Sequence, residues 1–305
     1  WAPKLDGIVT NMALHEGRIY VAGMFKKAGG QVRQGLAAFS LADGSLQAWD
    51  PQVNGEPRAL LLDPKEKAIY VGGSFTLVRG AVPRNNAAKF DLKDGAVLPW
   101  DPNLDAGVLA LESGPQGIYL GGMFKRINGP AKRPYAALVD RGQGKLKAWA
   151  PPISAMVYTI HLAGSQVMMG GDFGGLHENP KHNQIGLFDA TTGALDPWYP
   201  DHHSGIPSRI ENRGGNLVLG GSVYWQVPPG LRPYGQPEGL KLRGFLVYDL
   251  KAKEPLNCAI PAPSSIADFC IVGNTIYFGG VFSEILGQPQ SCLGALALPA
   301  CFPAP

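Results

Sequence analysis

The sequence has few charged residues, no long apolar run and no concentrated stretch of basic charge. Charged residues make up 17% of its 305 positions, and the formal net charge is only +3. The 27 basic residues are scattered, unlike the arms and patches that bind nucleic acid. The longest apolar candidate, Leu293 to Phe302, contains Pro299 and falls short of the ~18 residues of a membrane helix. The sequence therefore predicts neither a nucleic-acid partner nor a membrane span.

The sequence also lacks the local signatures of common enzymes. It contains no Gly-x-Ser-x-Gly elbow, phosphate-binding loop, dinucleotide fingerprint or His-Glu-x-x-His motif. His177-Glu178 begins like the last of these, but Lys181 stands where the second histidine would be. We therefore favour a non-enzymatic protein with no catalytic residues and no cofactor, and keep a metal-dependent enzyme as the alternative.

Cysteine is scarce and confined to the end of the chain, at Cys258, Cys270, Cys292 and Cys301. An even number suits two disulfides in an exported protein, and buried free thiols in a cytosolic protein are the alternative. Four cysteines admit three pairings, and nearness in sequence favours Cys258–Cys270 with Cys292–Cys301. The first residue is Trp1 rather than Met, as after removal of a signal peptide or a start inside a longer gene. We therefore predict a secreted or cell-surface protein.

What the sequence does contain is a repeat of about fifty residues. A strand-like phrase that ends in small residues occurs six times, and its last residues, Gly23, Gly73, Gly122, Gly171, Gly221 and Gly280, lie 50, 49, 49, 50 and 59 positions apart. Phe follows two residues later in five copies, and the fifth copy has Val223 there. A second apolar run ends at Phe39, Phe90, Val139, Phe188 and Tyr248. In the first four repeats a Trp-x-Pro phrase follows, at Trp49, Trp100, Trp149 and Trp198.

Each repeat has space for four short strands but not for a long helix. Four-stranded units of about this length are the sequence signature of a β-propeller, whereas the coils of a parallel β-helix, the rival fold, are usually shorter. We expect the glycine pair to permit close backbone approach, and Phe and Trp to fill the space between blades. The predicted fold is all-β: one six-bladed propeller domain of four-stranded antiparallel blades over residues 1–305. Its repeat units are approximately 8–51, 57–102, 107–151, 156–200, 208–261 and 266–305 with 1–5.

The two ends of the chain suggest how the propeller closes. The last repeat reaches its third strand at Gly294 to Leu298 and then lacks the Trp-x-Pro phrase. The chain begins with that phrase, Trp1-Ala2-Pro3. We therefore predict that the N-terminal segment completes the sixth blade and closes the ring.

The repeat resembles a known family. Its order of aliphatic strand, Gly-Gly, aromatic residue and Trp resembles the Kelch repeat. The sequence of the second repeat resembles the delta-60 repeat propellers of exported bacterial proteins more closely. It reads Tyr-Val-Gly-Gly-Ser-Phe at 70–75, Ala-Ala-Lys-Phe-Asp at 87–91 and Leu-Pro-Trp-Asp-Pro at 98–102. This resemblance spans the whole chain and implies a secreted or surface protein of poorly defined function. The sequence departs from it in the fifth repeat, where Cys258 replaces Trp, and in the sixth.

The fifth repeat carries an insertion of about ten residues. The step from Gly221 to Tyr248 is 27 residues, against 16 or 17 in the first four repeats. The insertion is rich in proline, which stiffens a loop, and in aromatic residues, which supply contact area at low entropic cost. A binding surface and an inert lid are equally good interpretations. If the insertion is a binding surface, the predicted binding residues are Tyr224, Trp225, Arg232, Tyr234, His202 and His203.

Histidine is concentrated near the same insertion, at His177, His182, His202 and His203. Propeller topology would bring these loops to one rim, where the histidines could hold zinc or copper. Solvated loop histidines are the alternative, because Pro180 and a spacing of five keep the first pair off one helix or strand face. Kelch-like propellers include the galactose oxidases, whose copper is held by two tyrosines and two histidines. Tyr224, Tyr234, His202 and His203 resemble that set, so a copper or hydrolytic enzyme on this rim is the alternative function.

The function we favour is a non-enzymatic, extracellular binding module. Its partner would be a protein or a surface glycan, and a larger extracellular assembly remains open. Two repeated sets of polar residues are assigned to the scaffold. Arg33, Arg84 and Arg133 stand in register and should bond to loop carbonyls, although a grip on an anionic group is the alternative. Asp91, Asp140, Asp189 and Asp249 follow third strands and should cap turns.

Overall fold

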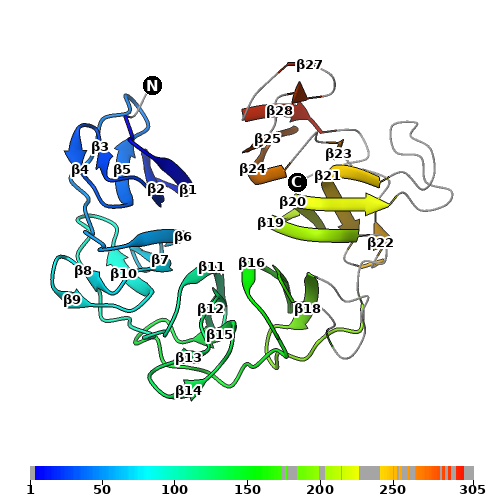
Figure 1. Cartoon of the computed structure of the whole chain (residues 1–305), viewed down its shortest axis with the longest axis horizontal. Helices are drawn as coiled ribbons and strands as arrows, with labels where there is room; N and C mark the ends of the chain where they lie inside the picture. Colours follow the sequence, from blue (N-terminus) through cyan, green and yellow to red (C-terminus); the bar gives the residue numbers. More distant parts are fainter. Residues whose placement is uncertain are drawn as a thin grey trace. The chain divides into compact units, whose positions relative to one another are not determined.

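The computed structural model describes residues 4–173, 176, 184–198, 203–213, 215–226, 241–249, 251–252, 254–255, 260–261, 265–281, 284–285, 288–289 and 293–298. The described residues contain strands and turns but no α-helix. The chain divides into two compact units, Trp1–Val157 and Tyr158–Pro305, which are called unit one and unit two below. Both are built from antiparallel sheets of consecutive strands (Figure 1).

Unit one contains three sheets of three strands, each followed in sequence by the start of the next. Between the second and third strand of each sheet lies a small outer hairpin of two-residue strands. The first sheet is β1 (Ile8–His15), β2 (Arg18–Met24) and β5 (Leu36–Ser40), with the hairpin β3 (Lys27–Ala28) and β4 (Gln31–Val32). The second is β6 (Glu56–Asp63), β7 (Ala68–Ser74) and β10 (Ala87–Asp91), with β8 (Leu77–Val78) and β9 (Val82–Pro83). The third is β11 (Val108–Gly114), β12 (Gly117–Gly122) and β15 (Ala136–Val139), with β13 (Arg126–Ile127) and β14 (Ala131–Lys132).

The described residues of unit two form three further sheets. The fourth is β16 (Val157–Ala163), β17 (Gln166–Gly171) and β18 (Ile185–Asp189). The fifth is β19 (His203–Arg213), β20 (Asn216–Gln226) and β21 (Lys241–Asp249), with β22 (Glu254–Pro255) and β23 (Ile260–Pro261) on its edge. The sixth is β24 (Ser265–Val272), β25 (Thr275–Val281) and β28 (Leu293–Ala297), with the hairpin β26 (Glu284–Ile285) and β27 (Gln288–Pro289).

The predicted four short strands of each blade are three strands and a single bridge in the first four sheets. There the fourth strand shrinks to one isolated bridge, such as Phe39↔Leu46 in the first sheet. In that sheet only Ser40 and Gln47 donate backbone hydrogen bonds across the pairing, to Ser45 and Ala38. The chain then turns away, because Trp49 packs toward the next sheet and Pro51 has no N–H to donate. In the fifth sheet the fourth strand is divided between β22 and β23.

The repeated Gly-Gly phrase forms the end of the middle strand. At both positions a side chain would collide with neighbouring atoms, which explains why glycine is used. The pairing between first and middle strands shifts by one residue, a β-bulge, in the second sheet between Pro57 and Ala59. A Cβ on Gly73 would collide with the backbone oxygen of Glu56 at that bulge. A Cβ on Gly72 would press on Val108 of the next sheet, so its absence lets two sheets approach closely. The prediction of close backbone approach at this phrase is confirmed.

Neighbouring sheets of unit one are joined by buried tyrosine and tryptophan side chains. Tyr20 and Trp49 are 1% exposed and meet edge to face at 5.1 Å between ring centroids. Trp49 donates its indole N–H to Asp91 O and Tyr20 donates its hydroxyl to Leu92 O, both at 2.9 Å and both in the second sheet. The pairs Tyr70–Trp100 and Tyr119–Trp149 repeat this geometry at 5.0 Å. The prediction of buried tryptophans is confirmed for Trp49, Trp100 and Trp149, whereas Trp198 is only partly buried.

Candidate functional site

The fifth sheet is longer than the other described sheets, and its extension carries three of the predicted binding residues. β19 and β20 span 11 residues each, against 6 to 8 for the first and middle strands elsewhere. Backbone pairs place His203 opposite Trp225, Ser204 opposite Tyr224, and Trp225 opposite Leu242. The insertion therefore starts as a paired ribbon that continues the sheet.

The remaining predicted site residues lie outside the described residues. They are Arg232 and Tyr234 of the binding set and His177, His182 and His202 of the metal set. Of the four residues compared with a copper site, only Tyr224 and His203 fall on described backbone. Among the residues that the structure describes, no three His, Cys, Asp or Glu side chains gather as a metal site.

A polar cluster that the sequence did not predict lies on the first strands of the fifth and sixth sheets. Arg209 on β19 lies 3.4 Å from Glu211 Oε1 and 3.8 Å from Asp268 Oδ1 on β24. Burial raises the pKa of both carboxyl groups, although the positive charge of Arg209 lowers it. Perturbed carboxyl groups of this kind occur at functional sites and also in structural ion pairs.

Two further titratable groups belong to the same surroundings. Burial, and then the charge of Arg209, lower the pKa of His161 on β16 to about 4, so this imidazole is neutral at physiological pH. Burial and the charges of Glu211 and Asp268 raise the pKa of Cys270. Its thiol is therefore a poor nucleophile at neutral pH, because the thiolate is the reactive form. As it stands, the cluster is a charge-coupled link between two sheets.

Aligning the repeats would have revealed this cluster. The residue directly after the bulge is Ala59 in the second sheet and Ala110 in the third. At the same register, the fifth and sixth sheets carry Arg209 and Asp268. Opposite charges at a repeated position that is uncharged in the first three sheets (Asn11, Ala59 and Ala110) were a signal that motif searches do not use.

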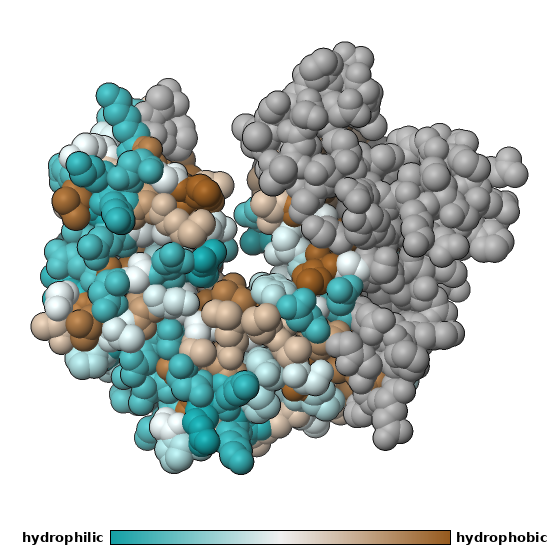
Figure 2. Space-filling model, viewed as in Figure 1, coloured by the Kyte–Doolittle hydropathy of each residue, from teal (hydrophilic) through white to brown (hydrophobic). Residues whose placement is uncertain are grey.

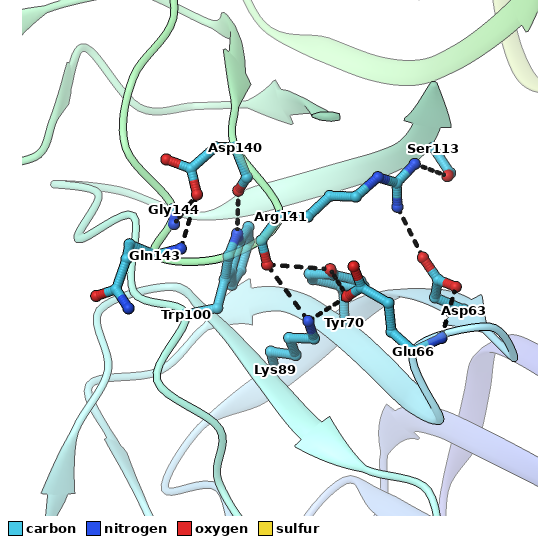
Figure 3. A network of polar contacts seen from close by, with 10 residues as sticks. All are labelled: Asp63, Glu66, Tyr70, Lys89, Trp100, Ser113, Asp140, Arg141, Gln143 and Gly144. Atoms are coloured by element: carbon cyan, nitrogen blue, oxygen red, sulfur yellow. Dashed lines mark hydrogen bonds and ion pairs between the residues drawn. The ribbon is translucent and has the colours of Figure 1, made fainter. Parts of the chain in front are cut away.

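A second polar network joins the second and third sheets of unit one (Figure 3). Arg141 bonds to Asp63 Oδ2 and Ser113 Oγ, both at 2.7 Å, and to Gly114 O at 2.8 Å. Lys89 pairs with Glu66, which also accepts the Tyr70 hydroxyl at 2.9 Å. Burial alone would raise the pKa of Glu66, but the bonds from Lys89 and Tyr70 outweigh it and lower that pKa. Burial and then Glu66 raise the pKa of the Tyr70 phenol.

This network satisfies its own charges, which indicates a structural role. The two buried charged groups, Asp63 and Lys89, are both 9% exposed, and each has an oppositely charged partner. Lys89 also lies 4.9 Å from the centre of the Tyr70 ring, where a cation is attracted to the aromatic face. Removing one partner would leave a buried charge without compensation, which is costly. The network therefore stabilises the contact between two neighbouring sheets.

Two of the three repeated arginines and all four repeated aspartates have structural contacts, as predicted, whereas the Arg133 side chain bonds to no described residue. Arg33 and Arg84 donate from their guanidinium groups to Val32 O and Pro83 O, at 2.9 and 2.8 Å. Asp189 accepts backbone N–H groups from Thr191 and Thr192, and these bonds lower its pKa. Asp91, Asp140 and Asp249 accept N–H groups from their own turns in the same way.

The predicted Cys258–Cys270 disulfide is wrong. Cys270 lies on β24 as an exposed free thiol. It follows Asp268 on the same strand and is the one cysteine among the described residues. Cys258, Cys292 and Cys301 lie outside the described residues, so the second predicted pair has no structural description. In the described part of the chain, no helix is long and apolar enough to cross a membrane.

Comparison with known proteins defines the fold class. No known family pattern and no curated protein matches this sequence. Among solved structures, the chain is similar to U3-55K and to the WD40 repeats of RRP9, each at 10% identity with a TM-score of 0.59. These alignments cover 92% of this chain and 78% and 77% of the other chains. The computationally designed Ika8 protein is similar at 12% identity with a TM-score of 0.54, over 92% of this chain and 83% of that chain.

The sheets and these similarities together define a repeat protein of the β-propeller class. WD40 repeats form four-stranded propeller blades, and the consecutive antiparallel sheets described here match that plan. At this level of identity the similarity shows the fold alone.

Proposed function

We propose that the chain is a closed, six-bladed β-propeller of the exported type that its repeat resembles, and that it acts as a non-enzymatic binding module outside the cell. The proposal has two parts, closure of the ring and binding by the fifth sheet. Each part is supported by described residues of the individual sheets.

The sixth sheet supports closure because its tyrosine lacks the burial of its counterparts. Tyr277 occupies the position of Tyr20 in the repeated strand phrase. Tyr20 is 1% exposed beneath its tryptophan and the next sheet, whereas Tyr277 is 45% exposed. The repeat assigns the missing tryptophan to Trp1. Trp1 itself lies outside the described residues. Closure of the ring predicts that it packs on Tyr277 and that both cover the first sheet.

The first sheet supports closure from its other face. Met12 holds the register position of Leu60, since they pair with Val21 and Val71 of the same repeated phrase. Leu60 is 9% exposed between the first and second sheets, but Met12 is 57% exposed. Leu41 and its counterpart Leu92 differ in the same way, at 42% and 5%. An apolar face of this kind fits the sixth sheet as its neighbour.

The extended ribbon of the fifth sheet is the observation that carries the binding function. It continues β19, β20 and β21 past the length of the other described sheets, at the position of the aromatic insertion. Strand pairing gives the base of this insertion a defined register, as a rigid recognition element requires. Aromatic residues with an arginine have the composition of an interface hot spot. The proposed partner is a protein or a surface glycan.

Deletion of the part of the insertion beyond the paired ribbon tests this function. Residues 227–240 are replaced by an Asn-Gly turn, which can connect β20 to β21 as a two-residue hairpin. Wild-type and deleted proteins are immobilised, and retained proteins from surface extracts and glycans on arrays are quantified. We expect the deletion to leave thermal unfolding unchanged and to abolish retention of every ligand bound specifically by the wild type.

The matched control is Val32→Ser in β4, because Val32 is 65% exposed on an outer hairpin of another sheet. This control should retain all wild-type ligands. Equal retention by the folded deletion variant would assign binding to another surface and overturn the role of the insertion.

The enzymatic alternative is a metal-dependent oxidoreductase or hydrolase on the same rim. Glu211 and Asp268 do not supply this rim with catalytic carboxyl groups, because Glu211 pairs with Val218 near the far end of β19 whereas His203 begins that strand. Metal analysis of the purified protein separates the two functions. Stoichiometric copper or zinc that is lost on changing His202 and His203 to Ala would favour the enzyme.

A further inference from the structure

The outer hairpin of the third sheet differs from its counterparts in the surroundings of an arginine that the first three repeats share. Arg33, Arg84 and Arg133 are held in the same place, since their backbone N–H groups donate to the carbonyls of Lys26, Thr76 and Lys125, respectively, at 2.9 to 3.0 Å. The Nε atom of each arginine is buried without a hydrogen-bond partner. The three side chains therefore begin from equivalent positions, and their differences lie in what surrounds the guanidinium group.

Two of these arginines face an aspartate of their own repeat. Arg33 lies 3.5 Å from Asp50 Oδ2, and Arg84 lies 3.8 Å from Asp101 Oδ2. Both aspartates occupy the middle of the Trp-x-Pro phrase. The third repeat has the exposed Ala150 at that position, and the Arg133 side chain makes no hydrogen bond or ion pair with any described residue. The third repeat thus keeps the arginine and lacks the carboxylate.

The hairpin around Arg133 concentrates further positive charge. Lys125, Arg126 and Lys132 are exposed on it, and Arg126 pairs directly opposite Lys132. Like charges in this arrangement destabilise a strand pair. The corresponding pairs of the other described outer hairpins are Lys27↔Val32, Leu77↔Pro83 and Glu284↔Pro289, none of which opposes like charges.

Among the described residues, one carboxylate is engaged at the base of this hairpin. Asp105 accepts the backbone N–H groups of Lys125 and Arg126, at 2.8 and 2.9 Å. The surface over β13 and β14 is correspondingly hydrophilic (Figures 1 and 2). Four cationic side chains with one acidic neighbour form a surface that complements an anion.

We propose that this hairpin binds an acidic peptide segment of a partner protein, with an aspartate or glutamate carboxylate of that segment on Arg133. The incoming carboxylate would take the place that Asp50 and Asp101 hold in the first two repeats. Arginine suits this role because its planar guanidinium bonds to carboxylates in a defined geometry. Arg126 and Lys132 would bind the flanking acidic residues and lose their mutual repulsion. The surface belongs to unit one, whereas the fifth-sheet ribbon belongs to unit two.

The decisive variant restores the internal carboxylate. Binding of a fluorescein-labelled oligo-aspartate peptide is measured by fluorescence anisotropy for the wild type, Ala150→Asp and the neutral control Ala150→Asn. We expect Ala150→Asp to weaken binding about tenfold or more, and Ala150→Asn to bind like the wild type. Arg133→Gln should weaken binding as strongly as Ala150→Asp. Thermal unfolding of each variant verifies that it is folded.

Arg33→Gln controls for nonspecific charge, because it removes one positive charge at the equivalent, internally paired position. It should leave peptide affinity within about twofold of wild type. Equal affinity of the Asp and Asn variants, or equal losses from Arg33→Gln and Arg133→Gln, would overturn the proposal. Tight binding of a sulfated heparin oligosaccharide that the peptide does not displace would overturn it in favour of a glycan.

Discussion

At the scale of single residues, the tyrosine and tryptophan of each repeat link one sheet to the next. Trp100 is fully buried and packs edge to face against Tyr70. Its indole N–H donates a hydrogen bond to Asp140 O at 2.8 Å (Figure 3). Trp100 therefore combines a large buried apolar surface with a hydrogen bond across the contact between sheets. The sequence alone could identify the tryptophan as scaffold, because it recurs at a constant distance after the second apolar run.

Trp100→Ala should lower the free energy of unfolding by about 3–5 kcal/mol, since it leaves a cavity and an unpaired carbonyl. Chemical denaturation monitored by far-ultraviolet circular dichroism measures this change. Trp198→Ala is the control and should cost less, because Trp198 is only partly buried. Equal costs for the two changes would contradict the assignment of Trp100 to the contact between sheets.

The carboxyl groups beside Arg209 predict a particular pH dependence. Burial raises the pKa of Asp268 above its unfolded value, so its contribution to stability is present at low pH and is lost as pH rises through the folded pKa. Asp268→Asn removes this contribution. The stability of the variant relative to wild type should therefore increase between about pH 4 and pH 7.

Urea denaturation of both proteins across this range measures the difference directly. Comparison with wild type is necessary because Asp6 and Asp189 have lowered pKa values, which impose the opposite slope on the whole protein. A relative stability of Asp268→Asn that falls with rising pH would show that the ion pair with Arg209 outweighs burial.

At the scale of secondary structure, the bulge between first and middle strands explains why each repeat ends its strand phrase with glycine. The register shift recurs between Val9 and Asn11, Pro57 and Ala59, Val108 and Ala110, Pro207 and Arg209, and Ile266 and Asp268. The second glycine faces the backbone oxygen at this shift, as Gly73 faces Glu56. The first position tolerates a small side chain, since the first sheet has the fully buried Ala22 there.

Gly73→Ala should therefore destabilise the protein by about 1–3 kcal/mol, because the new Cβ forces the bulge apart. Ala22→Gly, at the adjacent position of the equivalent strand, is the control and should cost no more than about 1 kcal/mol. Thermal unfolding of both variants decides the matter. A neutral Gly73→Ala would mean that the bulge is not sterically required.

At the scale of the whole molecule, closure of the ring is testable by charge substitution. Met12→Asp should cost about 3 kcal/mol or more if the sixth sheet covers this face, because it would bury an unpaired charge. In an open arrangement the same change should fall within about 0.5 kcal/mol, as for other surface positions. Leu60→Asp provides the buried reference, and Val32→Asp provides the exposed one. A denaturation midpoint of Met12→Asp that is close to that of Val32→Asp would disprove closure.

Sequence by itself determined the parts of this protein that repeat. The all-β class, the six strand phrases, the turn-capping role of Asp189 and the burial of Trp49 could all be predicted. Each of these features depends on local backbone requirements or on a contact that recurs at one spacing. An interpretation that holds for one repeat therefore holds for the other repeats. For the same reason the unusual fifth repeat could be recognised as a departure, although not what that departure binds.

Only the tertiary structure decided which side chains meet between sheets. Arg141 and Asp63 belong to different repeats and hold different positions within them, so no repeated spacing predicts this pair. The fourth strand shrinks to a bridge because packing of Trp49 toward the next sheet outweighs further hydrogen bonding within its own. Cys270 was assigned to a disulfide from nearness in sequence, but strand geometry leaves it exposed and unpaired. Contacts between sheets depend on three-dimensional placement of distant residues, which the linear order of the chain does not contain.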